Sequence, residues 1–260
     1  MQARVVSAAR GARWMAEGWR IFRAAPFGWV VAVLGYWLLM SILSVVPLVG
    51  VAVAAVLVPA FSVGFMALAR ASDRGGRGAR LDTLLLFEGF RHEPRAQLAL
   101  GAVYLASLAL LLGASALADD GALAQWMLTG RRPADDALYS DGFLAALGAA
   151  AALYAPVMLA FWFAPPLASW HGTGAAKALF FSFAASLMNW RAFLAYGAVA
   201  AALTLVLPLV LVTALSLVAG GSQPLPVAAL VFPLLVLLLP VFFASFYASY
   251  RDVFGYDAAP

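Results

Sequence analysis

Apolar residues follow one another in long uncharged runs along this chain, and they do not alternate with polar residues. The runs over residues 27–69 and 192–250 are each too long for one crossing of a bilayer, because a helical span takes about 20 residues. Pro47–Gly50 and Gly220–Pro224 supply turn residues within these runs, so each run predicts two spans. Two single runs lie between them, and Pro165–Pro166 predicts a kink or an early end in the second. The predicted spans cover residues 27–46, 50–70, 96–118, 143–170, 192–219 and 226–250.

This pattern predicts an all-α fold, a polytopic transmembrane helix bundle of six spans. Most Arg and Lys residues outside the spans lie in residues 1–26, 70–95 and 177–191, whereas the opposite side carries only Arg131 and Arg132 among several acidic residues. Positive connections stay in the cytoplasm, so both termini are expected there. The predicted organisation is a cytoplasmic interfacial helix over residues 1–26, a membrane domain over 27–250 and a short cytoplasmic tail over 251–260.

Residues 10–26 carry the sharpest helical periodicity in the chain. One arc is polar and contains Arg10, Arg13, Glu17, Arg20 and Arg23. The other arc contains Trp14, Met15, Gly18, Trp19, Ile21 and Phe22. The segment is too short to span, so we expect an interfacial helix with its arginines toward anionic headgroups and its tryptophans at the acyl boundary. Residues 175–190 show a weaker polar stripe and predict a second such helix, while residues 81–92 leave helix and loop both open.

A weak internal repeat accompanies the spans. Residues 22–26 and 90–94 share Phe, Arg and Pro at matching places, and each segment opens a span. This favours three modules, each an interfacial segment followed by a two-span hairpin. In a chain rich in Arg and Ala such matches also arise by chance, and both interpretations stay open.

Composition narrows the possible chemistry. Apolar residues make up 65% of the chain and charged residues 11%, far from the roughly equal apolar and polar balance of soluble domains. The absence of cysteine excludes disulfides and thiolate-ligated metals, and His92 and His171 are too few for a histidine-rich metal site. The net charge is +4, but the arginines lie beside spans and not on one compact face, which argues against nucleic acid and for anionic lipids as partners.

The candidate site residues follow from their places in this scheme. Residues expected to contact lipid headgroups are Arg10, Arg13, Arg20, Arg23, Lys177 and His171. Tryptophans expected to anchor the protein at the interface are Trp14, Trp19, Trp170 and Trp190. Small residues in the fourth span predict a helix-packing seam at Gly148, Ala149 and Ala152, with packing inside one chain favoured over a seam between two copies.

Several segments resemble a known group of proteins. They are Gly18–Arg23, Phe161–Pro165, Trp170–Gly172, Asn189–Trp190 and Ser249–Asp252. Together they resemble an uncharacterised family of bacterial six-span inner-membrane proteins, and the resemblance covers nearly the whole chain. The layout is also distantly similar to the membrane domain of some bacterial glycerophosphodiester phosphodiesterases. These resemblances imply an inner-membrane location and no activity.

The sequence predicts no catalytic, cofactor or metal site. The interiors of the predicted spans contain no ionisable residue, which disfavours an ion-coupled transporter. Ser115 has no histidine in a span to activate it, so a bond to its own helix is expected. We therefore expect no enzyme but a non-catalytic protein that organises lipids or partner proteins, among them other copies of itself. The alternative is a transporter or channel for an apolar or lipidic substrate.

Overall fold

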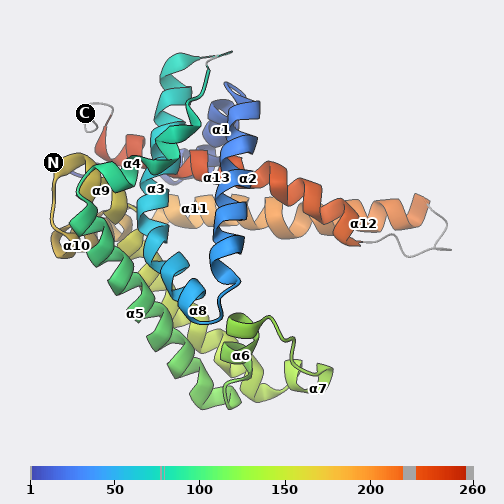
Figure 1. Ribbon diagram of the computed structural model, residues 1–260. Helices are drawn as coiled ribbons and strands as arrows, with labels where there is room; N and C mark the ends of the chain where they lie inside the picture. The colour runs from blue at the N-terminus through green and yellow to red at the C-terminus, as the bar shows by residue number, and fades with distance from the viewer. Residues whose placement is uncertain (1, 77, 79, 219–226, 256–260) are drawn as a thin grey trace. The chain divides into compact units, whose positions relative to one another are not determined.

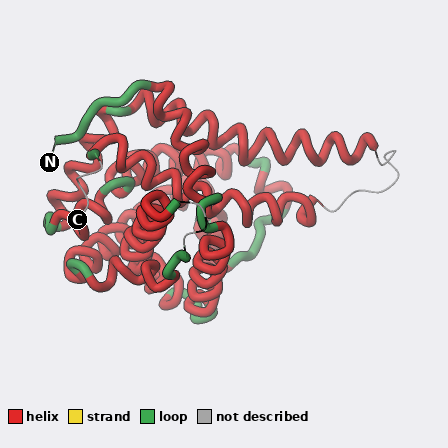
Figure 2. The backbone as a smooth tube through the Cα atoms, turned by 90° about the horizontal axis from the view of Figure 1, so that it is seen from above, coloured by secondary structure: helices red, strands yellow, loops and turns green. Residues whose placement is uncertain are grey.

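The computed structural model describes residues 2–76, 78, 80–218 and 227–255. Within these ranges all regular structure is helical and no strand occurs (Figure 2). Six helical segments are long and apolar enough to cross a membrane, which confirms the expectation of an all-α protein with six spans. The predicted turn at Gly220–Pro224 lies outside the described residues. The six segments are Pro26–Ser44, Val49–Gly75, Pro94–Asp119, Asp141–His171, Trp190–Leu217 and Val236–Phe254.

Short helices precede and connect these spans (Figure 1). The segment at residues 81–92, whose conformation the sequence leaves open, contains a 3-10 turn and one turn of α-helix. A short helix comes before each pair of spans, in agreement with a three-module order. The short helices are α1 (Ala8–Phe22), η1 (Thr83–Phe87), α4 (Glu88–Arg91), α6 (Ala122–Thr129), α7 (Asp135–Leu138) and α10 (Ala175–Met188).

Proline and turn residues decide where the first three spans begin and end. The span α2 (Pro26–Ser44) and the span α5 (Pro94–Asp119) both start at a proline, because the first turn of a helix needs no hydrogen bond from that nitrogen. The chain turns between α2 and α3 (Val49–Gly75), where Leu48 adopts a left-handed φ of 61°. The sequence predicts a turn at this place.

The fourth span is broken as its prolines predict. It consists of α8 (Asp141–Phe161) and α9 (Ala164–His171). Ser182 of α10 satisfies the backbone at the break, since its hydroxyl accepts from the Phe163 nitrogen at 2.9 Å and donates to the Leu159 carbonyl at 2.9 Å. A polar stripe on α10 was expected to mark an interfacial face, but Ser182 and Ser186 of that stripe are buried and both bond Leu159.

The fifth span is continuous but not uniform. It runs through α11 (Trp190–Ala201), a π-helical turn η2 (Ala202–Val206) and α12 (Leu207–Val218). The sixth span belongs to α13 (Val227–Phe254).

The helices form two compact units, which are considered separately. The first comprises residues 1–35, 64–86 and 187–260, and the second comprises residues 36–63 and 87–186.

In the first unit α1 lies against α11 and α13. A Cβ atom added at Gly11 or at Gly18 would overlap a backbone carbonyl, of Ala192 in α11 and of Val241 in α13 respectively. Glycine at these two positions therefore lets α1 lie directly on two spans. The sequence places the apolar arc of α1 at the acyl boundary, but most of this arc packs on protein, with Trp14 0% exposed, whereas Trp19 stays at the surface. Protein and lipid are both apolar partners, and the periodicity alone does not distinguish them.

In the second unit α5 packs against α8, α6 and α9. Its core includes Leu123, Phe143 and Ala146, all buried. Two glycines bring backbones together, since a Cβ atom at Gly101 would overlap the Val56 carbonyl and one at Gly89 would overlap the Ala60 carbonyl.

Candidate functional site

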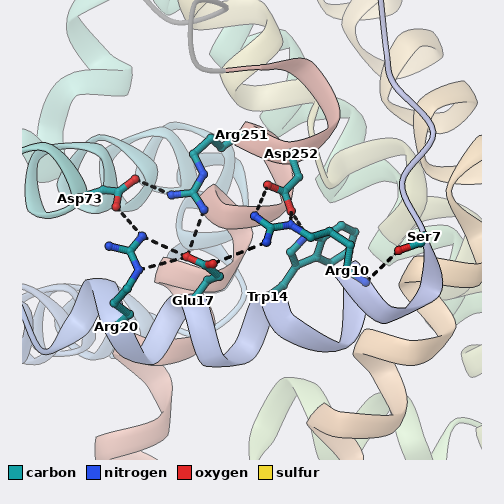
Figure 3. A network of polar contacts seen from close by, with 8 residues as sticks. All are labelled: Ser7, Arg10, Trp14, Glu17, Arg20, Asp73, Arg251 and Asp252. Atoms are coloured by element: carbon teal, nitrogen blue, oxygen red, sulfur yellow. Dashed lines mark hydrogen bonds and ion pairs between the residues drawn. The ribbon is translucent and has the colours of Figure 1, made fainter.

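A cluster of charged side chains joins α1 to the ends of two spans in the first unit (Figure 3). Residues of α1 at spacings of three and four lie on one face of that helix and supply four members of the cluster. The others come from the last turns of α3 and α13. The members are Arg10, Trp14, Glu17, Arg20, Asp73, Arg251 and Asp252.

Asp252 receives three donors from α1. Arg10 donates from both Nε and Nη2, the latter to Oδ1 at 2.8 Å, in the paired geometry that guanidinium and carboxylate groups favour. The indole nitrogen of Trp14 donates to the same carboxylate at 2.8 Å. The hydrogen bond that Arg10 donates to Asp252 raises the pKa of Arg10 above its ordinary value. This ion pair fixes the first half of α1 to the end of α13.

The second half of α1 belongs to a closed ring of alternating charges. Arg20 donates to Asp73 at 2.6 Å and to Glu17 at 3.0 Å, while Arg251 donates to the same two carboxylates. The side chains of Asp73 and Arg251 are only 2% and 7% exposed. Charges this deeply buried are stable only when they are paired, so the ring holds α1, α3 and α13 together.

The pKa of Glu17 reflects two opposing effects. Partial burial on its own would raise this pKa, but hydrogen bonds from Arg20 and Arg251 and the charges of both guanidiniums outweigh burial and lower it. Glu17 is therefore an ionised partner in the ring at neutral pH. A general base works best with a pKa near neutrality, and Glu17 is shifted away from that range.

The segment before α1 is tied down through its backbone. Arg4 donates its N–H to the Val253 carbonyl at 2.8 Å, and the Arg4 carbonyl accepts from the side chain of Asn189 at 3.0 Å. The Val6 N–H donates to the other atom of the same amide, Oδ1 of Asn189, at 2.8 Å. Asn189 is buried, so it holds the N-terminal segment against the start of α11.

A cleft of about 440 Å³ opens beside the cluster. Four arginines and two carboxylates line it, and Gly255 completes the wall. The charged residues are Arg4, Arg10, Glu17, Arg20, Arg251 and Asp252.

In the second unit, Glu88 of α4 has a place like that of Glu17 in α1, because it too accepts a hydrogen bond from a side chain near the end of a span. Glu88 is buried and accepts a hydrogen bond from the indole nitrogen of Trp170 at 2.9 Å. The side-chain nitrogen of Gln97 donates to the Pro165 carbonyl at 2.9 Å, at the broken fourth span. The sequence assigns Trp170 to the membrane interface, whereas the structure buries it and pairs it with an acid. Tryptophan suits both the membrane interface and a buried site beside an acid, because its ring is apolar and its N–H can donate a hydrogen bond.

The predicted headgroup contacts divide into two groups. Arg10 and Arg20 are engaged in the charged cluster, whereas Arg13, Arg23 and Lys177 are exposed. The Arg23 guanidinium lies 5.7 Å from the centre of the Trp19 ring, and the Lys177 ammonium lies over the Phe181 ring. His171 is half-buried at the end of α9.

The four tryptophans predicted to anchor the protein at the interface also divide into two groups, one exposed and one buried. Trp19 and Trp190 are 39% and 53% exposed and lie at the surface, where an anchor is expected. Trp14 and Trp170 are buried and donate to carboxylates.

The predicted seam on α8 is open in the structure. Gly148 and Ala152 are exposed and Ala149 is half-buried, and among the described residues no atom comes within 4 Å of a Cβ added at Gly148. The small residues of α8 that pack are Gly142, close to the Ala118 carbonyl, and the fully buried Ala146. Packing of Gly148 inside one chain was favoured, and the structure does not show it, because that residue lies on the outer face of α8.

Ser115 donates to the Leu112 carbonyl at 2.9 Å, as expected for a hydroxyl bonded to its own helix. In the part of the chain that the structure describes, no three or more His, Asp or Glu side chains gather in a group suited to a metal ion.

Sequence reasoning assigned no role in a site to Glu17, Glu88 or Asn189, nor to the acidic residues Asp73 and Asp252 at the ends of the spans. A signal was present, because Glu17–Arg20 and Glu88–Arg91 both read Glu, Gly, aromatic, Arg. In both segments the glycine lies on the backbone of a span and the glutamate accepts a hydrogen bond from a side chain near the end of a span.

The chain is similar to the probable inner membrane protein BTH_II0599 of Burkholderia thailandensis, with 38% identity over 261 residues that cover 98% of this chain and 94% of the relative. The chain matches no protein-family profile and no solved structure.

Proposed function

The chain belongs to the family of this Burkholderia thailandensis inner-membrane protein, and we propose that its role in that membrane is non-catalytic: it gathers anionic lipids around α1. Family membership and the six apolar helices make it a multi-pass protein of the inner membrane. The lipid partner is inferred from the arrangement of charge on α1.

One observation carries the proposal. The face of α1 toward the protein has its charges compensated, by Asp252 for Arg10 and by Asp73 and Glu17 for Arg20. Arg13 of α1 and Arg23, which follows the last residue of that helix, are exposed, and no ion pair to either occurs among the described residues. Because α1 runs directly into the span α2, these two cations are held beside the membrane surface, where they attract anionic headgroups.

The state of the carboxylates supports a non-catalytic role. Asp73, Glu17 and Asp252 each pair with at least one guanidinium, so these carboxylates already have partners within the protein. The lowered pKa of Glu17 also makes that carboxylate a weak proton acceptor.

Orientation is part of the proposal. The excess of Arg and Lys on the side of α1 favours cytoplasmic N- and C-termini. Reporter fusions after Arg10 and Lys177 should then report the cytoplasm, and a fusion after Pro133 should report the other side. A cytoplasmic signal at Pro133 would contradict this orientation.

The lipid preference is tested in reconstituted bilayers of phosphatidylcholine with a minor fraction of phosphatidylglycerol. Spin-labelled lipids of both kinds report which one is enriched next to the protein. We expect enrichment of phosphatidylglycerol that weakens with added salt and falls in the double variant Arg13→Glu, Arg23→Glu. Arg131→Glu, on the connection between the third and fourth spans, is the matched control and should keep more of the preference. Equal amounts of both lipids next to the wild-type protein would refute the proposal.

A further inference from the structure

We propose that the cleft lined by Arg4, Arg10, Arg20 and Arg251 binds the phosphate group of an anionic membrane lipid. The inference rests on the proposed function and sharpens it, because it assigns one bound lipid to one site in addition to the diffuse attraction of the exposed arginines.

The cluster around the cleft has an excess of positive charge. Its four guanidiniums face three carboxylates, of Glu17, Asp73 and Asp252, so within the described part of the chain the cluster has one more positive than negative group. A phosphodiester group carries a single negative charge and would neutralise this excess. The volume of about 440 Å³ lies within the range of about 300–1,000 Å³ that small-molecule sites occupy.

Arg4 is the cation that the charged cluster does not use. Hydrogen bonds to Val253 and Asn189 fix its backbone, but its guanidinium forms no hydrogen bond or ion pair within the described residues. The side chain lies over Gly255, where an added Cβ atom would be only 3.4 Å from Nη2 of Arg4. A fixed backbone, a glycine that leaves room and a free guanidinium at the cleft together favour an anionic ligand there.

Arg20 is a second arginine that lines the same cleft. It uses Nε and Nη2 for Glu17 and Asp73. Guanidinium groups bind phosphate oxygens through paired N–H donors, so Arg4, with Arg20 beside it in the lining, provides the type of donor that a phosphate needs.

The position of the cleft favours a lipid as the source of the phosphate. It lies beside the final turn of α13 and beside α1, which leads into α2, and Asn189 at the start of α11 holds its Arg4 wall. The ends of membrane spans lie at the depth of lipid headgroups.

A purely structural role accounts for most of the cluster but not for Arg4. The ion pairs that fix α1 involve Arg10, Arg20 and Arg251 with their three carboxylates, and they are complete without Arg4. Replacing Arg4 should therefore leave the fold intact and remove only the ligand.

The test uses the full-length protein in nanodiscs of phosphatidylcholine with phosphatidylglycerol, released into detergent and weighed by native mass spectrometry. We expect one retained phosphatidylglycerol on the wild-type protein and about fivefold lower occupancy on Arg4→Gln. Arg131→Gln makes the same chemical change at an exposed residue outside both the cleft and α1, and it should retain the lipid as the wild type does. Unchanged thermal unfolding of both variants confirms their folding.

A parallel arm identifies the source of the phosphate. Inorganic phosphate is added to protein in pure phosphatidylcholine nanodiscs, and thermal unfolding is followed. Stabilisation that depends on Arg4 in this arm, without a retained lipid in the first, would support the phosphate site and overturn its assignment to a lipid. Equal lipid retention by wild type and Arg4→Gln, or no Arg4-dependent effect in either arm, overturns the site itself. The spin-label enrichment of phosphatidylglycerol is a separate measurement, so it can persist when the cleft fails.

Discussion

The two units fasten a short helix to their spans in related but unequal ways. In both, a glycine lies on a span backbone, Gly18 on Val241 in the first unit and Gly89 on Ala60 in the second. In both, the residue before that glycine is a glutamate that accepts from a side chain near the end of a span. The donor is Arg251 for Glu17 but the neutral indole of Trp170 for Glu88.

The two units share the glycine contact and the glutamate, and they differ in the number of charged side chains around the attached helix. In the second unit, α4 has a close backbone approach at Gly89 and one carboxylate, Glu88, that accepts from a neutral indole. The first unit has additional charges, an ionic ring and a cleft, and these belong to the long helix α1. We therefore associate the additional charged residues around α1 with the proposed binding of anionic lipid.

The largest effect is expected from breaking the ionic ring. Arg251→Gln removes one of the two arginines that pair with Asp73 in the ring, and Asp73, which is 2% exposed, keeps its ion pair with Arg20. Removing one partner of a buried ion pair costs about 3–5 kcal/mol, and the lower end applies because Arg20 stays. Thermal and denaturant unfolding in detergent measures the loss. Arg13→Gln, at an exposed position, should change stability by less than about 0.5 kcal/mol, and an equal loss in both variants would contradict the role of the ring.

The next effect tests the backbone approach in the first unit. Gly18→Leu forces a side chain into the Val241 carbonyl, and overpacking of this kind costs about 1–3 kcal/mol. The matched control is Gly148→Leu on α8, which has open space and should unfold like the wild type. A comparable loss at Gly148 would instead show that a second copy or another protein covers that face of α8.

A smaller effect is expected in the second unit. Trp170→Phe keeps the aromatic bulk but removes the indole donor from Glu88. A hydrogen bond to a charged group contributes about 1.5–3 kcal/mol, and we expect the lower end because Glu88 also has other interactions. A larger loss of stability in this variant than in Arg251→Gln would contradict the claim that the ionic ring of the first unit is the stronger attachment.

The smallest effect is a dependence on acid. The folded-state pKa of Glu17 lies below its ordinary value of 4.5, so Glu17 stabilises the folded protein above that value. The contribution is lost as the pH falls through the lower, folded-state pKa. Unfolding temperature should therefore decline below about pH 4.5 more steeply in the wild type than in Glu17→Gln. Parallel pH profiles for the two proteins would contradict the shift.

The number of spans could be predicted because it depends on local runs of apolar residues. The turn before Val49 and the break before Ala164 follow from Pro47, Pro165 and Pro166 in the same local way. The charged cluster could not be predicted, because it pairs α1 with Asp73 and Asp252, which are far away in sequence.

The sequence of α1 alone also could not predict whether its apolar arc packs against lipid or against other helices. A helical period shows that one face of the helix is apolar. Trp14 would fit that pattern whether it contacted lipid or, as it does, the aromatic side chains of α11. The signal that distinguishes them is glycine, since Gly11 and Gly18 on that face serve a close backbone contact and would gain nothing in lipid.

The central claim is that the face of α1 that carries Trp14 packs on protein, while the exposed side of the same helix, which includes Trp19, meets lipid. A photoreactive benzoyl-phenylalanine placed at Trp14 or at Trp19 in the reconstituted protein tests this directly, because the two sites share one helix but are 0% and 39% exposed. We predict that the probe at Trp14 cross-links to peptides from α11 or α13, and that the probe at Trp19 captures lipid. Lipid adducts at Trp14 as abundant as those at Trp19 would contradict the account.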